Sequence, residues 1–335
     1  MYTFISFVLV FGLLVFFHEF GHFALAKLNK IKVHEFALGM GPRILKFKGK
    51  ETEYAIRLFP IGGFVKMEGE DEISEDAGSF SKKSPLQRIS VIVAGPIMNI
   101  VLAVILFTII ALSLGIPVNV IDKVTENYPA QKAGIHPGDK IIRINEQNIN
   151  SWEDIVETIS KTKKDILTIE VLRDNETLSF KVSPLKDPDT DKKFIGISPV
   201  LKKSLPLSLK FSLERVAMVT KGITGFLSKF VKGKASTEEV VGPIGMVHFV
   251  GKAARISIYS LLSLAAVISI NLAILNLLPF PALDGGRLFF ILLELIKGKP
   301  VDPDKEGFVH LVGFVILIIL MIFVLYKDIT RFNLF

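Results

Sequence analysis

Four long apolar runs stand out in the pattern of hydrophobic and polar positions along the chain. They cover residues 1–28, 89–116, 256–278 and 308–326. About 20 consecutive apolar residues are needed to cross the hydrocarbon core of a bilayer as a helix. Each run is close to or above that length, and the run at 89–116 contains no charged residue. The pattern therefore predicts a polytopic α-helical membrane protein with four transmembrane helices.

The loop between the first two runs, residues 29–88, is basic and contains a strand-like stretch. Together with Lys27 it carries twelve Lys and Arg residues, which favours the cytoplasmic side under the positive-inside rule. Residues 50–70 alternate between apolar and polar and carry Gly62-Gly63, which predicts a β-hairpin with a turn at the glycines. Two interpretations remain open. The hairpin either dips toward the membrane and offers strand edges to an extended peptide, or lies on the surface.

Residues 117–200 have the pattern of a soluble α+β domain inserted between the second and third runs. Serine at position 151 is a suitable N-cap for a helix that follows Trp152. Strand-like segments occur at residues 118–124, 140–144, 167–173 and 177–182. Residues 201–255 contain an amphipathic stretch with basic residues between apolar ones, which predicts a segment that lies on the membrane surface.

Composition narrows the class of protein. Half of the residues are hydrophobic and the mean hydropathy is +0.48, as in membrane proteins. Charged residues still make up 22%, so part of the chain lies in water. The absence of cysteine excludes disulfides, thiolate metal ligands and a thiol nucleophile. The net charge of +7 fits basic loops beside anionic lipid, and no nucleic-acid motif is present.

The most informative chemistry lies inside the first run, where His18-Glu19-Phe20-Gly21-His22 interrupts the apolar pattern. An H-E-x-x-H motif on a helix places two histidines one turn apart, where both can bind one Zn²⁺. The glutamate between them can act as the general base toward an attacking water. Ionisable groups at membrane depth are costly and usually functional. A secretory signal peptide is excluded, because no basic segment precedes the run.

A zinc site of this type needs a third protein ligand. By residue type the candidates are the remaining histidines, His34, His136, His248 and His310. Asp284 is the stronger candidate, because it follows the third span on the side where His18 and His22 lie. Two prolines before it break the helix, and irregular backbone at membrane depth is tolerated where it lines a cavity. We therefore assign residues 256–295 to the third span together with an Asn/Pro/Asp segment.

Several motifs together resemble the site-2 protease family (M50), in particular its bacterial RseP/RasP-type intramembrane zinc metalloproteases with one PDZ domain. They are the H-E-F-G-H motif, the segment from Asn276 to Gly285, and residues 94–99 and 242–245. Residues 129–142 resemble the PDZ signature of bacterial proteases. The resemblance covers essentially the whole chain, which has room for a single PDZ-like domain over 117–200.

The resemblance implies roles for particular residues. His18, His22 and Asp284 would be the zinc ligands, and Glu19 would be the catalytic base. Four further positions would hold an unwound substrate beside the zinc, namely Asn271, Asn276, Pro279 and Pro281. Gly95 and Asn99 in the second span are interpreted mainly as architectural, because a small residue lets helices approach and Asn can bond between them.

The sequence thus predicts an intramembrane zinc endopeptidase that cleaves transmembrane segments of single-span membrane proteins. The resemblance implies substrates such as anti-sigma factors, and also signal-peptide remnants. We expect a bacterial plasma-membrane protein with the active site toward the cytoplasm and the PDZ-like domain outside. A metal transporter or sensor is disfavoured by the few polar residues in the spans. A membrane scaffold bearing a PDZ-like domain would not need Glu19 between two histidines.

Overall fold

The structure, a computed structural model, describes residues 2–70, 74–188, 191–234 and 241–331. It divides into two compact units. Unit 1 comprises residues 1–107 and 212–335, and unit 2 comprises residues 108–211. Each unit has its own cluster of buried apolar side chains.

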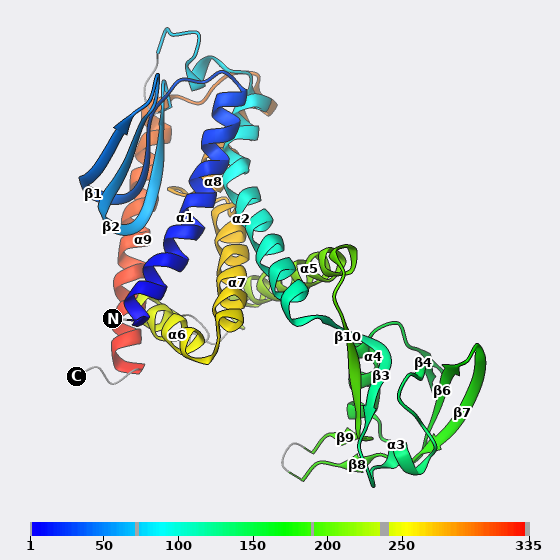
Figure 1. The fold of residues 1–335 in the computed structure, drawn as a ribbon. Helices are drawn as coiled ribbons and strands as arrows, with labels where there is room; N and C mark the ends of the chain where they lie inside the picture. Colours follow the sequence, from blue (N-terminus) through cyan, green and yellow to red (C-terminus); the bar gives the residue numbers. More distant parts are fainter. Residues whose placement is uncertain (1, 71–73, 189–190, 235–240, 332–335) are drawn as a thin grey trace. The chain divides into compact units, whose positions relative to one another are not determined.

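Unit 1 is built around four helices that are long and apolar enough to cross a membrane (Figure 1). They are α1 (Tyr2–Leu28), α2 (Pro85–Leu114), α7 (Ile258–Asn276) and α9 (Pro303–Arg331). The four apolar helices predicted from the sequence are therefore present. Three of them differ from the predicted runs at both ends: α2 and α9 begin before their apolar runs, and α7 begins two residues after its run, where Ser257 caps it. Caps rather than the limits of an apolar run decide where a helix ends. Ser84 and Gln87 form such a cap, so that α2 begins four residues before the apolar run.

Four further helices belong wholly or mostly to unit 1 among the described residues. They are η1 (Phe80–Lys82), α5 (Leu205–Val231), α6 (Pro243–Ile256) and α8 (Asp284–Lys297). The amphipathic stretch predicted over 201–255 is thus divided between two helices. α6 begins at Pro243, and the Asp328 carboxylate of α9 accepts hydrogen bonds from the Gly242 and Gly245 backbone N–H groups at 3.1 and 2.8 Å. The last apolar helix is therefore tied to the start of α6.

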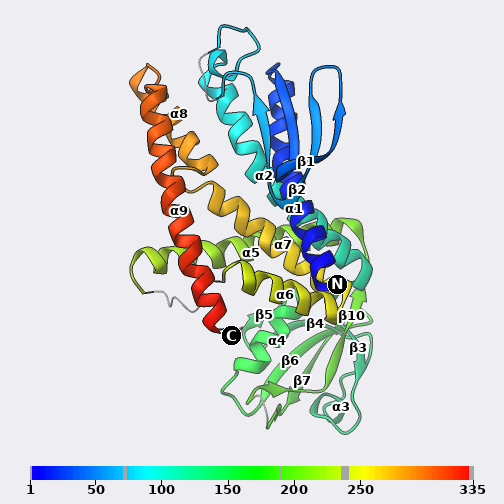
Figure 2. The ribbon, with the colours of Figure 1, turned by 90° about the vertical axis from the view of Figure 1, so that its left-hand side faces the viewer.

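A bent sheet of two long strands, β1 (Val33–Lys48) and β2 (Glu53–Met67), lies beside α1 (Figures 1 and 2). Residues 35–38 pair with 53–56 on one side and with 63–66 on the other. The hairpin predicted within 50–70 is therefore wrong in its pairing, because residues 35–38 lie between its two arms and the arms do not pair with each other. Gly62, with a φ of +74°, does lie where β2 folds back, so the predicted change of direction at the glycines is present.

The sheet is joined to the helices by a shared apolar core. Its buried members come from α1, β1, β2, η1, α2, α8 and the segment that follows α1, and they are Ala26, Ile31, Val33, Phe36, Val65, Met67, Phe80, Val91, Ile92 and Ile291. Burial of such side chains contributes about 1.5–3 kcal/mol each. The core therefore holds the end of β2 close to the C-terminal end of α1, where the histidines lie.

Unit 2 is an α+β domain whose longer strands and main helix agree with the predictions. Its main sheet has the strand order β10-β3-β4-β6-β7, with β5 beside β4, and β8 pairs with β9. The strands are β3 (Ile116–Val124), β4 (Lys140–Ile144), β5 (Gln147–Asn148), β6 (Leu167–Arg173), β7 (Glu176–Val182), β8 (Leu185–Lys186), β9 (Lys193–Phe194) and β10 (Ile197–Lys202). The helices are α3 (Pro129–Lys132) and α4 (Trp152–Lys161), and Ser151 caps α4 as predicted.

A buried ion pair supports the core of unit 2. The Asp139 carboxylate is 1% exposed and accepts hydrogen bonds from Arg173 Nε and Nη2 at 2.6 and 2.8 Å. It also accepts one from the His136 backbone N–H at 2.9 Å. Burial alone would raise the pKa of Asp139, but these hydrogen bonds hold the pKa below its ordinary value.

Because the pKa is lowered in the folded state, the ionised carboxylate stabilises unit 2 above its unfolded pKa of about 3.9. This contribution is lost as the pH falls through the folded value. We expect Asp139→Asn to lower the free energy of unfolding by about 2–3 kcal/mol at pH 7, with part of the pair's effect screened because Arg173 is partly exposed. Trp152, the single tryptophan, packs on this core. Its fluorescence in urea reports the unfolding of unit 2 within the full-length chain. If the free energies of unfolding of wild type and Asp139→Asn differed by the same amount at pH 7 and at pH 3, the prediction would be contradicted.

Candidate metal centre

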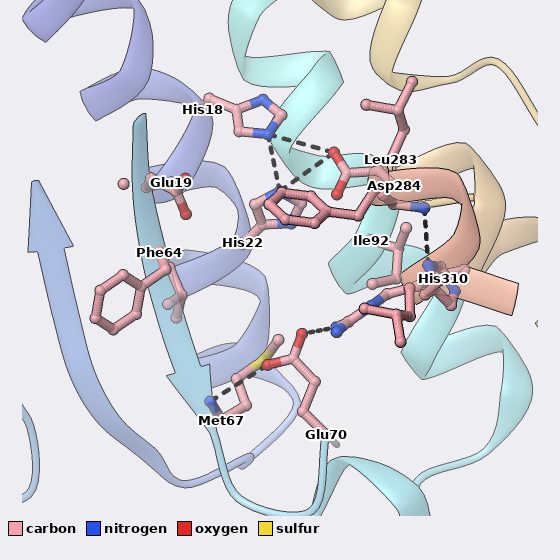
Figure 3. Close-up of a pocket in the computed structure, with 16 residues that line it drawn as sticks. His18, Glu19, His22, Phe64, Met67, Glu70, Ile92, Leu283, Asp284 and His310 are labelled. Carbon is pink, nitrogen blue, oxygen red and sulfur yellow. Dashed lines mark hydrogen bonds and ion pairs between the residues drawn. The ribbon is translucent and has the colours of Figure 1, made fainter. Parts of the chain in front are cut away.

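Three predicted ligands converge where α1 meets the start of α8. The Nε2 atoms of His18 and His22 lie 3.3 and 3.5 Å from Asp284 Oδ2, and 3.3 Å from each other. His18 and His22 share one face of α1 because they are four residues apart. Asp284 is the first residue of α8, after the break that its prolines impose. Figure 3 shows the three side chains pointing toward one another.

These atoms suit a tetrahedral cation. Two ligand atoms that each lie about 2.0–2.1 Å from a tetrahedral zinc are about 3.3–3.4 Å apart, close to the separations observed here. The Asp284 Oδ2 atom is buried and has no hydrogen-bond donor among the described residues. Two imidazoles and a carboxylate are a common donor set for catalytic zinc, with one position left for substrate or water. The residues present therefore fit Zn²⁺.

Groups around the two histidines fix their orientation. His22 Nδ1 lies 2.9 Å from the backbone carbonyl of Val91, to which it can donate. This leaves its Nε2 free as a ligand. Asn99 is fully buried, and its amide lies 3.4 Å from His18 Nδ1. If the amide oxygen takes that position, it accepts a hydrogen bond from His18 Nδ1 and leaves His18 Nε2 free as a ligand. Asn276 Nδ2 lies 3.3 Å from His18 Nε2, so one predicted substrate-binding residue touches the ligand set.

Two glycines allow α1 and α2 to approach closely at this point. A Cβ on Gly21 would meet the backbone of Ala94, with its carbonyl carbon at 2.7 Å. A Cβ on Gly95 would overlap the His22 ring, with Cε1 at 2.6 Å and Cδ2 at 2.8 Å. Gly95 is therefore architectural, as predicted, and it also provides the space that the His22 imidazole occupies.

Glu19 lies beside the ligands in a cavity of about 530 Å³ (Figure 3). Its side chain is largely buried, and a Cβ on Gly63 of β2 would come within 2.9 Å of Glu19 Cγ. The residues that line the cavity come from α1, the end of β2 and the segment after it, α2, α8 and α9, and from the loop before Asp284. They are His18, Glu19, His22, Gly63, Phe64, Val65, Met67, Glu70, Ile92, Ala282, Leu283, Asp284, Arg287, His310, Leu311 and Phe314.

The other residues predicted to bind substrate or to serve as the third ligand lie away from the cavity lining or from the ligand cluster. Asn271, Pro279 and Pro281 are outside this lining. Pro281 instead packs against α9, where a Cβ on Gly313 would meet its carbonyl oxygen at 2.6 Å. The four other histidines considered as third ligands lie outside the cluster that the described residues form around Asp284. Of these, His34 pairs with Glu68, with Nε2 and Oε2 2.6 Å apart.

Some residues of the site carried no signal in the sequence. The Val91 carbonyl is a backbone group, which no residue pattern reveals. Glu70 and Arg287 form a close ion pair between the segment after β2 and α8, at the edge of the cavity. Arg287 stands three residues after Asp284, so its helical spacing could have suggested that it shares a face with the ligand.

Comparison with known proteins identifies the family of the chain. The model of peptidase family M50 matches residues 6–320. The chain belongs to peptidase family M50. A protein of Clostridium acetobutylicum is 43% identical over 327 residues, covering 96% of each chain. Zinc metalloprotease RasP of Bacillus licheniformis is 36% identical over 417 residues, and Regulator of sigma-W protease RasP of Bacillus subtilis is 34% identical over 416.

These alignments cover 99% of both chains for the Bacillus licheniformis protein and 98% of both for the Bacillus subtilis protein. This M50 peptidase is therefore a zinc metalloendopeptidase with a Zn²⁺ cofactor. Its homologues and its four apolar helices indicate a bacterial membrane protein. The PDZ domain of an SdrC-like protein from Listeria monocytogenes is similar over 26% of this chain and 87% of its own, with 22% identity and a TM-score of 0.22.

The close fit of Gly95 leads to a prediction. We expect Gly95→Ala to displace the His22 imidazole and weaken zinc binding by about tenfold or more. A misplaced ligand should lower the metal affinity at least as much as the loss of a hydrogen-bond partner of that ligand does. Chelator competition on the purified M50 peptidase measures this. Gly12→Ala in α1 is the matched control, because nothing lies within 4 Å of that position. Equal zinc affinity in both variants would contradict the role assigned to Gly95.

Proposed function

We propose that this M50 peptidase is an intramembrane endopeptidase that cleaves transmembrane segments of single-span membrane proteins. The observation that carries the proposal is the position of His18, His22, Asp284 and Glu19. They line one cavity among helices apolar enough to span a bilayer. A hydrolytic site so placed is suited to substrates that lie in the membrane themselves.

The proposed chemistry follows from the residues. Zn²⁺ is held by His18, His22 and Asp284, and when bound it supplies Lewis acidity for the scissile carbonyl and the attacking water. Glu19 takes the proton from the water as general base and passes it to the leaving amine as general acid. The Val91 carbonyl and Asn99 keep the two imidazoles turned toward the metal.

The last part of β2 supports a mode of substrate binding. Residues 63–66 pair with 35–38 on one side, and among the described residues no strand pairs with their other side. Gly63, Phe64 and Val65 line the cavity. An unwound substrate can add to this edge as an extended strand, with main-chain hydrogen bonds that any sequence can make. We propose that Asn276, whose amide lies 3.3 Å from His18 Nε2, contacts the unwound substrate beside the metal centre. We propose that Asn271, Pro279 and Pro281 contact the substrate outside the cavity.

We propose that the rest of the sheet contacts the membrane, although it also exposes Lys46 and Lys48. Its exposed large apolar side chains include Met40, Ile44, Leu45, Phe47, Ile56, Leu58 and Phe59. Contiguous exposed apolar surface marks interaction with a membrane or a partner. The two arginines of the sheet, Arg43 and Arg57, are neutralised by Glu35 at 2.7 and 2.6 Å. Of the two interpretations of the hairpin, these contacts favour the one that dips toward the membrane.

The orientation in the membrane, the role of the PDZ-like domain and the substrates are proposed from the sequence and from the relatives. We propose that the metal centre faces the cytoplasm and that the PDZ-like domain, residues 117–200, lies outside and limits access by size or binds trimmed substrate ends. The name of the Bacillus subtilis relative connects that protein with sigma-W. Anti-sigma factors and signal-peptide remnants are accordingly the substrates that we propose for this chain.

Purified protein incubated with paired model substrates tests the proposal. Leaving a backbone group unpaired in lipid costs several kcal/mol, so a Gly-Pro insertion near the scissile bond lowers the cost of unwinding. We expect initial rates about tenfold or more higher on the substrate with the insertion than on its matched Leu-rich partner, and no cleavage of either with a zinc chelator. Failure to cleave any membrane-embedded segment, with soluble peptides still hydrolysed, would contradict the intramembrane proposal.

A further inference from the structure

The position of Asp284 depends on the irregular loop that precedes α8. Asp284 is the first residue of that helix, so its backbone is set by residues 277–283 rather than by preceding helical turns. Ala282 in this loop has a φ of +72°, a left-handed conformation that costs a residue with a Cβ free energy. Such strain persists where surrounding contacts hold it in place. The contacts that hold Ala282 therefore bear on the metal ligand two residues later.

Those contacts come from α9. The Ala282 backbone N–H donates to His310 Nδ1 at 2.9 Å, and Figure 3 shows His310 below Asp284 with this bond dashed. Gly313, one turn further along α9, lets Pro281 approach the helix backbone. Positions 310 and 313 share a face of α9. The last apolar helix thus supports two consecutive residues of the loop.

The surroundings of His310 fit an acceptor at Nδ1. An imidazole that accepts at Nδ1 carries its proton on Nε2. His310 Nε2 is buried and has no hydrogen-bond partner among the described residues, and the carboxylate oxygen Oε1 of Glu306 lies 3.7 Å from it. The ring also packs against Phe290 of α8, with centroids 5.7 Å apart. The side chain is 19% exposed, so it is held by these neighbours.

We propose that His310 is a positioning residue for the metal centre. By accepting the Ala282 N–H it fixes the left-handed turn, and this turn aims the Asp284 carboxylate at His18 and His22. The inference rests on the proposed ligand role of Asp284. His310 itself stands outside the ligand cluster of the described residues, so its effect on the metal is transmitted through the loop.

Three substitutions in the full-length protein test the role. His310→Leu fills much of the same space with an apolar side chain and removes the acceptor. His310→Asn places an amide oxygen one bond beyond Cγ, where Nδ1 stands, and His310→Gln carries the same amide one carbon further out. Tyr326→Leu is the control, because this residue is on the same helix and 66% exposed. The measurements are the Zn²⁺ dissociation constant by chelator competition without substrate, the thermal midpoint, and kcat and KM.

We expect His310→Leu and His310→Gln to raise the Zn²⁺ dissociation constant about tenfold, in the range seen when a supporting contact of a metal ligand is lost. kcat should fall with KM unchanged, and the thermal midpoint should stay close to that of the Tyr326→Leu control. His310→Asn should bind zinc within about threefold of wild type. The Asn variant thus separates loss of the acceptor from loss of packing.

Wild-type zinc affinity in His310→Leu would overturn the proposal. Equal losses in the Asn and Leu variants would also overturn it, because they would assign His310 to packing. Wild-type zinc affinity in Asp284→Asn would remove the ligand role on which the inference rests. Because zinc binding is measured without substrate, none of these outcomes depends on whether the protease cleaves membrane segments.

Discussion

Glu19→Gln is expected to abolish cleavage while leaving zinc bound. The amide keeps the size of the side chain but cannot take a proton from water, and loss of a general base costs about 10²- to 10⁴-fold in rate. Because Glu19 stands outside the three-residue ligand cluster, metal content should stay near that of the wild-type protein. Initial rates on a single-span substrate and elemental analysis of the same preparation measure both effects.

The matched control is Glu51→Gln. Glu51 is paired with Lys27 at 2.9 Å, its side chain is 71% exposed, and it lies outside the cavity. This variant should therefore cleave like wild type. Turnover of Glu19→Gln at the rate of the control would rule out the proposed general base.

Asp284→Asn is expected to lose zinc and activity together. The substitution replaces the carboxylate beside His18 and His22 with a neutral amide, which is a poor ligand for Zn²⁺. Loss of supporting contacts costs up to about 100-fold in metal affinity, so loss of a ligand should cost about 100-fold or more. The zinc dissociation constant should rise and the initial rate should fall, and excess zinc should restore part of the rate.

Asp165→Asn supplies the comparison for this variant, because the Asp165 carboxylate is fully exposed in unit 2. If Asp284→Asn held zinc as tightly as this control, Asp284 would not be the third ligand. Partial recovery of activity at high zinc distinguishes a weakened site from a misfolded protein, which added metal cannot restore.

Much of the candidate site could be predicted from the sequence because its signals are local. The spacing of His18 and His22 needs only the period of a helix, and the helix break before Asp284 needs only two prolines. The contributions of Val91 and His310 could not be predicted. Val91 acts through a backbone carbonyl that every residue has. By residue type His310 was one of four histidines considered as the third ligand, but its Nδ1 accepts the Ala282 N–H in the folded chain.

The sequence by itself determined the four apolar helices, four of the strands and the helix cap of unit 2, and the residue types that can bind zinc, because hydrophobic period, turn residues and ligand spacing are properties of neighbouring residues. Only the tertiary structure decided that residues 35–38 lie between two parts of β2, that Gly95 makes room for His22, and that α9 supports the loop before Asp284. Each of these features brings together residues that are far apart in the chain. Such contacts depend on how whole helices and strands pack against one another, which no local pattern of residues specifies.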